Sequence, residues 1–259
     1  MLIDSHVHFD DPRFDVDRNA VYQRALDAGV EAMIIPAVTA ESWGRTKEIA
    51  DQYSHVFPAY GLHPYFIDQH KQQDFALLRE WLKKEKPVAV GEAGLDYYLK
   101  DLDQIKQQDF FETQLEIAKE FDLPIIIHAR KAVEDVIKTI KKIDHKKGMI
   151  HSFNGSLQQA EQLIESGYFL SFGGAATFAG SKNIRSLIKK LPLERLLLET
   201  DAPDQPDAQH QGERNEPAFM VEILDTFVAL RSESKDEIVL QTKRNTIDLF
   251  DLKFRVRKR

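Results

Sequence analysis

The chain has 259 residues, 42% of them hydrophobic and 30% charged, which is enough for an α/β domain with a substantial core. Its net charge of −7 argues against a surface that attracts polyanions as a whole, and its lack of cysteine excludes disulfides and thiolate metal sites. The first residues do not resemble a signal peptide and no apolar run reaches the roughly 18 to 20 residues of a membrane span, so we expect a cytoplasmic protein without a membrane partner.

Short aliphatic segments alternate with longer helical patterns along the whole chain. The segments lack strict apolar–polar alternation, which is typical of strands buried on both faces of a parallel sheet. We expect strands at residues 2–5, 31–37, 55–61, 88–92, 124–128, 148–152, 168–172 and 195–199. We expect helices at residues 16–28, 41–52, 72–84, 103–121, 131–143, 156–166, 181–190, 216–231 and 234–249. This count predicts an α/β fold, a TIM-like (β/α)8 barrel forming one domain over residues 1–259, with an open doubly wound sheet as the alternative.

Histidines and carboxylates stand where the predicted strands end. The residues at these C-terminal ends are His6, His8, His63, Glu92, His128, His151 and Asp201. In a parallel barrel all these ends open onto one face, which is where barrel enzymes place their active sites. We therefore expect side chains from distant parts of the sequence to converge there.

Most of these residues are suited to metal binding. Without a metal, clustered imidazoles would repel one another once protonated and the carboxylates would need compensation. We predict that two divalent cations are bound by His6, His8, Glu92, His128, His151 and Asp201. Two such cations can share and activate a water, with Glu92 as a bridge between them and Asp201 as the acceptor of the water's proton. Nitrogen and oxygen ligands suit Zn, Mn, Ni or Fe, and Mg is less natural with four imidazoles.

Other residues near the strand ends are candidates for contact with a substrate. We predict that His63 hydrogen-bonds a phosphate or protonates a leaving oxygen, the alternative being support of the barrel rim. Arg130 and Arg214 are candidate phosphate ligands; the alternative is an ion pair behind the metal ligands for Arg130 and a solvated surface position for Arg214. Aromatic residues that either stack on bases or pack at the rim are Tyr65, Phe66, Tyr97 and Tyr98.

Six short motifs together resemble the TatD-type hydrolases in order and spacing. They are Asp4-Ser5-His6-Val7-His8-Phe9, Gly61-Leu62-His63-Pro64, Gly91-Glu92-Ala93-Gly94-Leu95-Asp96, His128-Ala129-Arg130, His151-Ser152-Phe153-Asn154-Gly155 and Glu199-Thr200-Asp201-Ala202-Pro203. With Arg214-Asn215-Glu216-Pro217 included, the resemblance covers residues 4–217, and residues 156–161 and 199–206 resemble the YjjV branch of bacterial members. The resemblance implies a barrel of the amidohydrolase-like type. It further implies one metal surrounded by His6, His8, Glu92 and Asp201, and a second surrounded by Glu92, His128 and His151.

The resemblance also implies an activity. Members are associated with metal-dependent DNase activity, including 3′-to-5′ exonuclease action, and some with deacylation of D-aminoacyl-tRNA. We predict a phosphodiesterase or deoxyribonuclease that acts on nucleic-acid ends or nucleotide phosphoesters, with Asp201, Glu92 and His63 as catalytic residues. The same ligands would serve a carbon–oxygen or carbon–nitrogen hydrolase, such as a D-aminoacyl-tRNA deacylase. A non-catalytic, metal-stabilised binding protein is the alternative from another class, and no obligate protein partner can be inferred.

The sequence departs from the family pattern at two places. Asp204-Gln205 stands where many members have an aromatic or aliphatic residue, and Ala93 replaces the commoner isoleucine. Neither change touches a predicted ligand. Asp204, however, is expected to place a negative charge near the mouth of the site, which argues against nuclease activity in particular.

Overall fold

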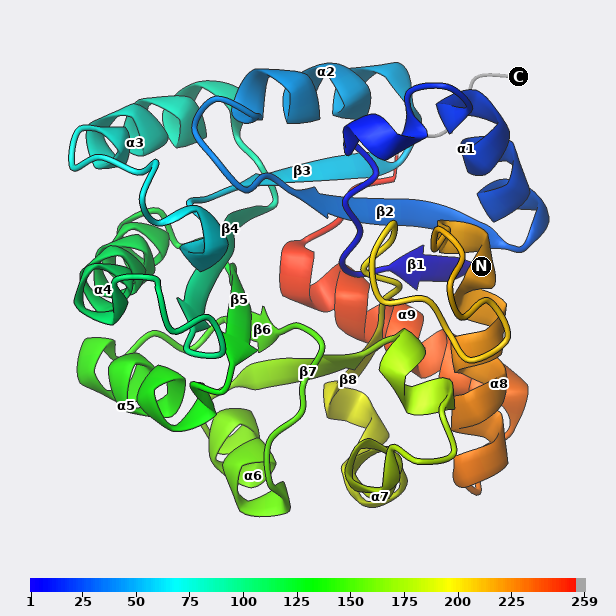
Figure 1. Cartoon of the computed structure of the whole chain (residues 1–259). Helices are drawn as coiled ribbons and strands as arrows, with labels where there is room; N and C mark the ends of the chain where they lie inside the picture. Colours follow the sequence, from blue (N-terminus) through cyan, green and yellow to red (C-terminus); the bar gives the residue numbers. More distant parts are fainter. Residues whose placement is uncertain (255–259) are drawn as a thin grey trace. The chain divides into compact units, whose positions relative to one another are not determined.

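The computed structural model describes residues 1–254, and Figure 1 shows its helices and strands. Within these residues, eight strands form one sheet whose order follows the chain from β1 to β8. They are β1 (Leu2–Asp4), β2 (Val30–Pro36), β3 (Val56–Tyr60), β4 (Ala89–Asp96), β5 (Ile125–Arg130), β6 (Gly148–Ile150), β7 (Tyr168–Phe172) and β8 (Leu196–Leu198). Parallel strands in chain order, each followed by a helix, are the arrangement of the predicted (β/α)8 barrel.

Helices connect the strands of the described chain. The α-helices are α1 (Arg18–Asp27), α2 (Trp43–Gln52), α3 (Asp74–Glu85), α4 (Gln104–Glu120), α5 (Val133–Ile143), α6 (Leu157–Glu165), α7 (Lys182–Lys190), α8 (Met220–Leu230) and α9 (Lys235–Phe250). The short 3-10 helices are η1 (Pro12–Phe14), η2 (Pro64–Phe66), η3 (Gly174–Thr177), η4 (Leu193–Arg195) and η5 (Pro217–Phe219). None of the helices in this part of the chain has the length and apolar content that a membrane span requires.

The chain divides into two compact units. Unit 1 comprises residues 1–35, 48–57 and the chain from residue 171 onward, and unit 2 comprises residues 36–47 and 58–170. The prediction that residues 1–259 form one domain stays a prediction.

In unit 1, helix α9 packs against β1 and β8 (red, blue and yellow-green in Figure 1). It begins at Ser234, whose side chain and that of Glu237 form a capping box, as that spacing predicts. The buried Asn245 donates from Nδ2 to the carbonyls of Leu193 and Leu196, both at 2.8 Å. The start of β8 is thus fixed to the helix that covers it.

In unit 2, helix α4 packs against β4 and carries two buried glutamines that bind the chain after β3 and the end of β4. Gln107 accepts from the backbone N–H of Asp96 at 2.8 Å and donates to its carbonyl at 3.3 Å. Gln114 does the same for Leu62, at 2.7 and 3.1 Å. Both glutamines therefore satisfy backbone groups where the chain approaches candidate functional residues.

The end of β4 differs from the prediction. The sequence predicts that the strand stops at residue 92, whereas it continues to Asp96, so Glu92 lies inside the strand. The register against β5 shifts between Val90 and Ala93, and the neighbouring glycines, Gly91 and Gly94, both have a φ of 143°. The two glycines thus form an irregularity within the strand, which redirects side chains without ending the pairing.

Candidate metal centre

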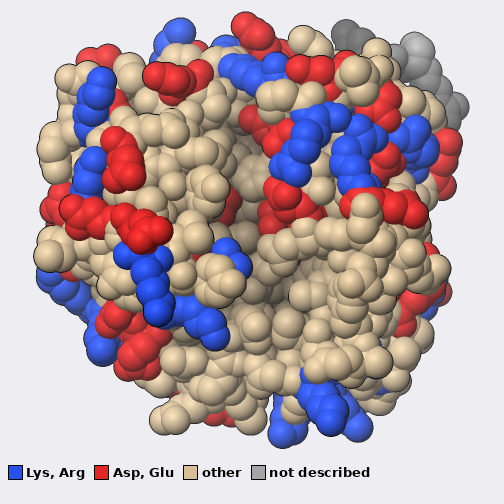
Figure 2. All heavy atoms as spheres, viewed as in Figure 1, with Lys and Arg blue, Asp and Glu red and all other residues tan. Residues whose placement is uncertain are grey.

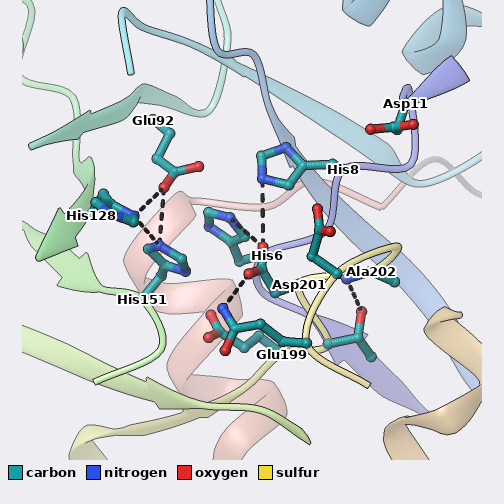
Figure 3. Close-up of polar contacts among 12 residues, drawn as sticks. His6, His8, Asp11, Glu92, His128, His151, Glu199, Asp201 and Ala202 are labelled. Atoms are coloured by element: carbon teal, nitrogen blue, oxygen red, sulfur yellow. Dashed lines mark hydrogen bonds and ion pairs between the residues drawn. The ribbon is translucent and has the colours of Figure 1, made fainter. Parts of the chain in front are cut away.

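Unit 1 brings together three of the predicted ligands, His6, His8 and Asp201. Nε2 of His6 lies 3.3 Å, and Nε2 of His8 3.5 Å, from Oδ1 of Asp201. Figure 3 shows both imidazoles directed at this carboxylate. Two imidazole nitrogens and a carboxylate oxygen that face one another form a donor set that fits a divalent cation.

The loops after β1 and β8 hold this set in place. Oδ1 of Asp4 accepts from the backbone N–H of His6 at 3.3 Å and of Thr200 at 3.0 Å, while Oδ2 accepts from the Thr200 hydroxyl at 2.5 Å. The N–H of Asp201 in turn donates to the carbonyl of His6 at 3.0 Å. Burial raises the pKa of Asp4 to about 7 against the opposing hydrogen bonds of Thr200, with the charge of Glu199 adding to the rise. Asp4 stands in the motif Asp4-Ser5-His6-Val7-His8-Phe9, but no role was predicted for it from the sequence.

The structure places the Asp204-Gln205 departure beside an arginine. The Asp204 carboxylate accepts two hydrogen bonds from Arg13, at 2.8 and 2.7 Å, but Arg13 also binds Asp11, so the three side chains together keep a negative charge. Nε2 of Gln205 donates to Oδ2 of Asp201. Gln205 therefore orients the Asp201 carboxylate, whose other oxygen faces the two histidines.

Glu199 is a further buried carboxylate of unit 1, labelled in Figure 3, that the sequence reasoning did not single out. Its Oε2 accepts from the Ser171 hydroxyl at 2.5 Å. It follows β8 directly, two residues before Asp201. Its place in the motif Glu199-Thr200-Asp201 could have identified Glu199 as a candidate site residue from the sequence.

Unit 2 gathers the other predicted ligands around Glu92, which is only 1% exposed. Its Oε1 lies 2.9 Å from Nε2 of His63, 3.2 Å from Nδ1 of His128 and 3.0 Å from Nε2 of His151. Figure 3 shows His128 and His151 turned toward this carboxylate. The donor atoms of His63, Glu92 and His128 all lie within 4.8 Å of one another, a spacing at which one cation can be held.

Asp96 fixes the orientation of His128. Its Oδ2 lies 3.1 Å from Nε2 of His128, which leaves Nδ1 facing Glu92. Burial lowers the pKa of His128, but its hydrogen bonds to Asp96 and Glu92 outweigh burial and raise the pKa above its usual value. Burial acts to raise the pKa of Asp96. The hydrogen bond with His128 and the charge of that residue outweigh burial, so the pKa of Asp96 lies below its usual value. In metal sites the far nitrogen of a ligating histidine is almost always hydrogen-bonded to a carboxylate, a backbone carbonyl or a water, and Asp96 is such a partner for His128.

His63 lies among these donors, but its hydrogen bonds favour a role other than metal binding. Its Nδ1 accepts from the backbone N–H of Tyr65 at 3.0 Å. A neutral imidazole has one N–H and one acceptor nitrogen, so Nε2 of His63 carries the proton. A protonated nitrogen cannot ligate a metal, and a neutral imidazole is too weak an acid to release this proton, so the hydrogen bond favours the predicted contact of His63 with a phosphate.

His63→Ala is expected to keep the metal content of the parent protein and to lower kcat by about 10²- to 10³-fold, the usual effect of losing one hydrogen-bond donor to the transition state. Elemental analysis of the purified variant, alongside steady-state kinetics, measures both quantities. Loss of bound metal from His63→Ala would show that His63 is a ligand instead.

Arg214, a predicted phosphate ligand, is engaged within unit 1. Its guanidinium donates to both carboxylate oxygens of Asp17, at 2.8 and 2.7 Å, to Glu216 at 2.8 Å and to the carbonyl of Arg13 at 2.8 Å. Glu216 also accepts from Arg24 at 2.8 Å through each oxygen. Figure 2 shows such basic and acidic side chains side by side near α1. Arg214 is thus ion-paired within the chain, which neither the phosphate prediction nor the solvated alternative anticipated, and its contact with a substrate stays a prediction.

Arg214→Met is expected to lower the free energy of unfolding by about 1–2 kcal/mol, since it removes charge-assisted hydrogen bonds that are partly screened by solvent. The value for kcat/KM should stay within about twofold of the parent. Urea denaturation and steady-state kinetics check the two effects. A large rise in KM at unchanged stability would restore Arg214 as a substrate ligand.

The remaining substrate-contact candidate, Arg130, ends β5 in unit 2 and is exposed. Its guanidinium lies 3.8 Å from the centroid of the Tyr98 ring. The structure thus places every predicted ligand in one of two donor sets, His6, His8 and Asp201 in unit 1 and Glu92, His128 and His151 in unit 2. The prediction that both sets converge on one binuclear centre stays a prediction.

Comparison with known proteins places the chain in a family. The family model described as TatD related DNase matches residues 3–251. The uncharacterized metal-dependent hydrolase YjjV of Escherichia coli is 40% identical over 254 residues, which are 97% of this chain and 98% of that protein. The uncharacterized metal-dependent hydrolase YabD of Bacillus subtilis is 34% identical over 96% of this chain and 99% of that protein.

Solved structures agree with this assignment. The crystal structure of the TatD homologue YjjV from Escherichia coli superposes with a TM-score of 0.94 at 40% identity, over 97% of this chain and 98% of that one. A TatD-family hydrolase from Entamoeba histolytica shares the fold with a TM-score of 0.84 at 23% identity, over 96% and 97% of the two chains. These matches confirm the predicted α/β fold of the TIM-like barrel class and the predicted resemblance. The chain therefore belongs to the TatD-related DNase family, the family of its metal-dependent hydrolase relatives.

Proposed function

We propose that this metal-dependent hydrolase cleaves phosphoester bonds, at nucleic-acid ends or in nucleotides, with one divalent cation at each donor set. The observation that carries the proposal is the convergence of imidazole nitrogens and a carboxylate oxygen in each unit, at 3.3–3.5 Å around Asp201 and 2.9–3.2 Å around Glu92. The description of the family as DNase-related supports a nucleic-acid substrate.

The two sets divide the ligands between the cations. His6, His8 and Asp201 would hold one cation, and Glu92, His128 and His151 the other, with Glu92 as the proposed bridge. When bound, such cations polarise the phosphoryl oxygen and lower the pKa of water, so that hydroxide is available at neutral pH. The donor chemistry suits Zn, Mn, Ni or Fe, and Mg less well.

Two side chains would act directly on the reacting groups, Asp201 as a base and His63 as a hydrogen-bond donor. Asp201 accepts the proton of the attacking water, and Gln205 holds the carboxylate in the required orientation through Oδ2. His63, whose Nδ1 accepts from Tyr65, has its proton on Nε2 and would donate a hydrogen bond from it to an oxygen of the phosphoester.

The test is a hydrolysis screen on protein stripped by chelation and reloaded separately with Zn, Mn, Ni, Fe or Mg. Its substrates are a 3′-ended oligonucleotide, a chromogenic phosphodiester, a D-aminoacyl-tRNA and a cyclic amide. We expect cleavage of the first two, and a loss of about 10²- to 10⁴-fold in Asp201→Asn, the usual contribution of a general base.

Two outcomes would contradict the proposal. Deacylation of the aminoacyl-tRNA without phosphodiester cleavage would indicate a carbon–oxygen hydrolase built on the same ligands. Full metal loading with no turnover of any substrate would instead indicate a metal-stabilised binding protein.

A further inference from the structure

Unit 2 carries a guanidinium that is fixed on an aromatic ring and open to solvent. Cζ of Arg130 lies 3.8 Å from the ring centroid of Tyr98, the distance of direct stacking. Arg130 is exposed, and Tyr98 is 54% exposed. A ligand in solution can therefore reach both side chains.

Arg130 and Tyr98 lie at the C-terminal ends of two neighbouring strands: Arg130 ends β5, and Tyr98 follows β4. Arg130 is in register with Asp96 across the β4–β5 ladder, and its carbonyl accepts from the N–H of Tyr97 at 2.9 Å. The N–H of Tyr98 donates to Oδ1 of Asp96 at 3.0 Å. The other oxygen of Asp96 orients His128, which lies two residues before Arg130 on β5 and so on the same face of that strand. The stacked pair is thus tied to the residues that hold a proposed metal ligand.

The hydrogen-bonding edge of Arg130 is available. Among residues 1–254 its guanidinium donates no hydrogen bond, whereas Arg214 makes four and Arg13 is bound to two carboxylates. Stacking occupies one face of the guanidinium and leaves the N–H edge, whose fork matches the oxygens of a phosphate. An arginine held by a ring loses little conformational freedom on binding such an anion.

We propose that Arg130, positioned by Tyr98, forms a subsite for a second phosphate of the substrate, one that is not cleaved. The proposal rests on the proposed phosphoester hydrolysis and narrows its substrate class to nucleotidyl esters that carry a further phosphate, as in an oligonucleotide. Arg130 contacts that phosphate through its N–H edge, and Tyr98 acts on Arg130 alone.

The experiment compares two chromogenic esters that differ by one phosphate. They are the p-nitrophenyl ester of thymidine 5′-phosphate and the same ester with an added 3′-phosphate. We expect the parent protein to prefer the second, and Arg130→Met to raise KM for it by about 10- to 100-fold, the effect of losing charge-assisted hydrogen bonds. With the first ester, kcat/KM should stay within about twofold.

Variants at both positions separate positioning from contact. Arg130→Lys should recover only part of the loss, because an ammonium lacks the planar fork. Tyr98→Leu should raise KM for the two-phosphate ester without changing kcat, while Tyr98→Phe, which keeps the ring, should match the parent. Arg79→Met, which removes an arginine paired with Glu120, is the matched control and should leave both esters unaffected.

A binding measurement keeps this test independent of turnover. Calorimetry with thymidine 3′,5′-bisphosphate and the chelated protein should show weaker binding by Arg130→Met, even if neither ester is cleaved and the proposed hydrolysis fails. Equal losses on both esters, no preference of the parent for the added phosphate, or unchanged bisphosphate binding in Arg130→Met would each overturn the subsite.

Discussion

Glu92→Gln is expected to lower the divalent metal bound to the chain and to reduce hydrolysis by about 100-fold or more. Glu92 is 1% exposed, and its Oε1 lies within 3.2 Å of three imidazole nitrogens. Glutamine keeps the shape but not the charge, and a neutral amide is a weak ligand among imidazoles. Replacing a group that merely supports a ligand typically costs about 10- to 100-fold, so the loss of a ligand should cost at least as much.

Metal analysis after dialysis, alongside kinetics, measures this effect. Loss of one metal ion per chain would indicate that Glu92 binds only the cation held with His128 and His151. Loss of two metal ions per chain would support the prediction that Glu92 ligates both cations. Glu112→Gln, at a partly exposed carboxylate of α4 paired with Lys142, is the control and should keep the parental metal content. Full metal content in Glu92→Gln would contradict the ligand assignment.

The placement of the candidate ligands could largely be predicted from the sequence. His6, His151 and Asp201 follow β1, β6 and β8 as expected, because buried aliphatic strands are visible as runs and their C-terminal ends share one side of a parallel sheet. Glu92 and His128 are the exceptions, since β4 continues past Glu92 to Asp96 and β5 continues past His128 to Arg130. A glycine in a strand-like segment is compatible both with the end of the strand and with an irregularity inside it. Only the observed pairing of β4 with β5 distinguishes the two cases.

The pairing of charges could not be predicted. Arg13 binds Asp204 and Arg214 binds Asp17 across 191 and 197 residues, and both contacts depend on loop conformations that a single sequence does not encode visibly. The sequence therefore could not show that Asp204 shares Arg13 with Asp11, or that Asp17 and Glu216 engage the guanidinium of Arg214. Asp96 was more accessible to reasoning, because a metal-binding histidine requires a partner on its second nitrogen and Asp96 stands in a recognised motif.

Gly94→Ala is expected to lower the free energy of unfolding by about 3 kcal/mol or more, or to prevent folding. Gly94 has a φ of 143°, which L side chains rarely adopt, and a Cβ there would lie 2.0 Å from the carbonyl oxygen of His128. That oxygen belongs to the backbone of β5, so it cannot move aside without disturbing the β4–β5 pairing. An unfavourable φ and an overpacked contact each cost about 1–3 kcal/mol.

Urea denaturation of Gly94→Ala beside Gly44→Ala isolates this effect. Gly44 lies in helix α2, and a Cβ there meets no atom within 4 Å, so alanine should change stability by no more than about 1 kcal/mol and in the favourable direction. Because the clash falls on the carbonyl of His128 itself, any folded fraction of Gly94→Ala should also bind metal less tightly than the parent. Equal unfolding free energies for the two variants would show that β4 can shift at this point, and that the close approach of Gly94 to His128 does not hold the second donor set in place.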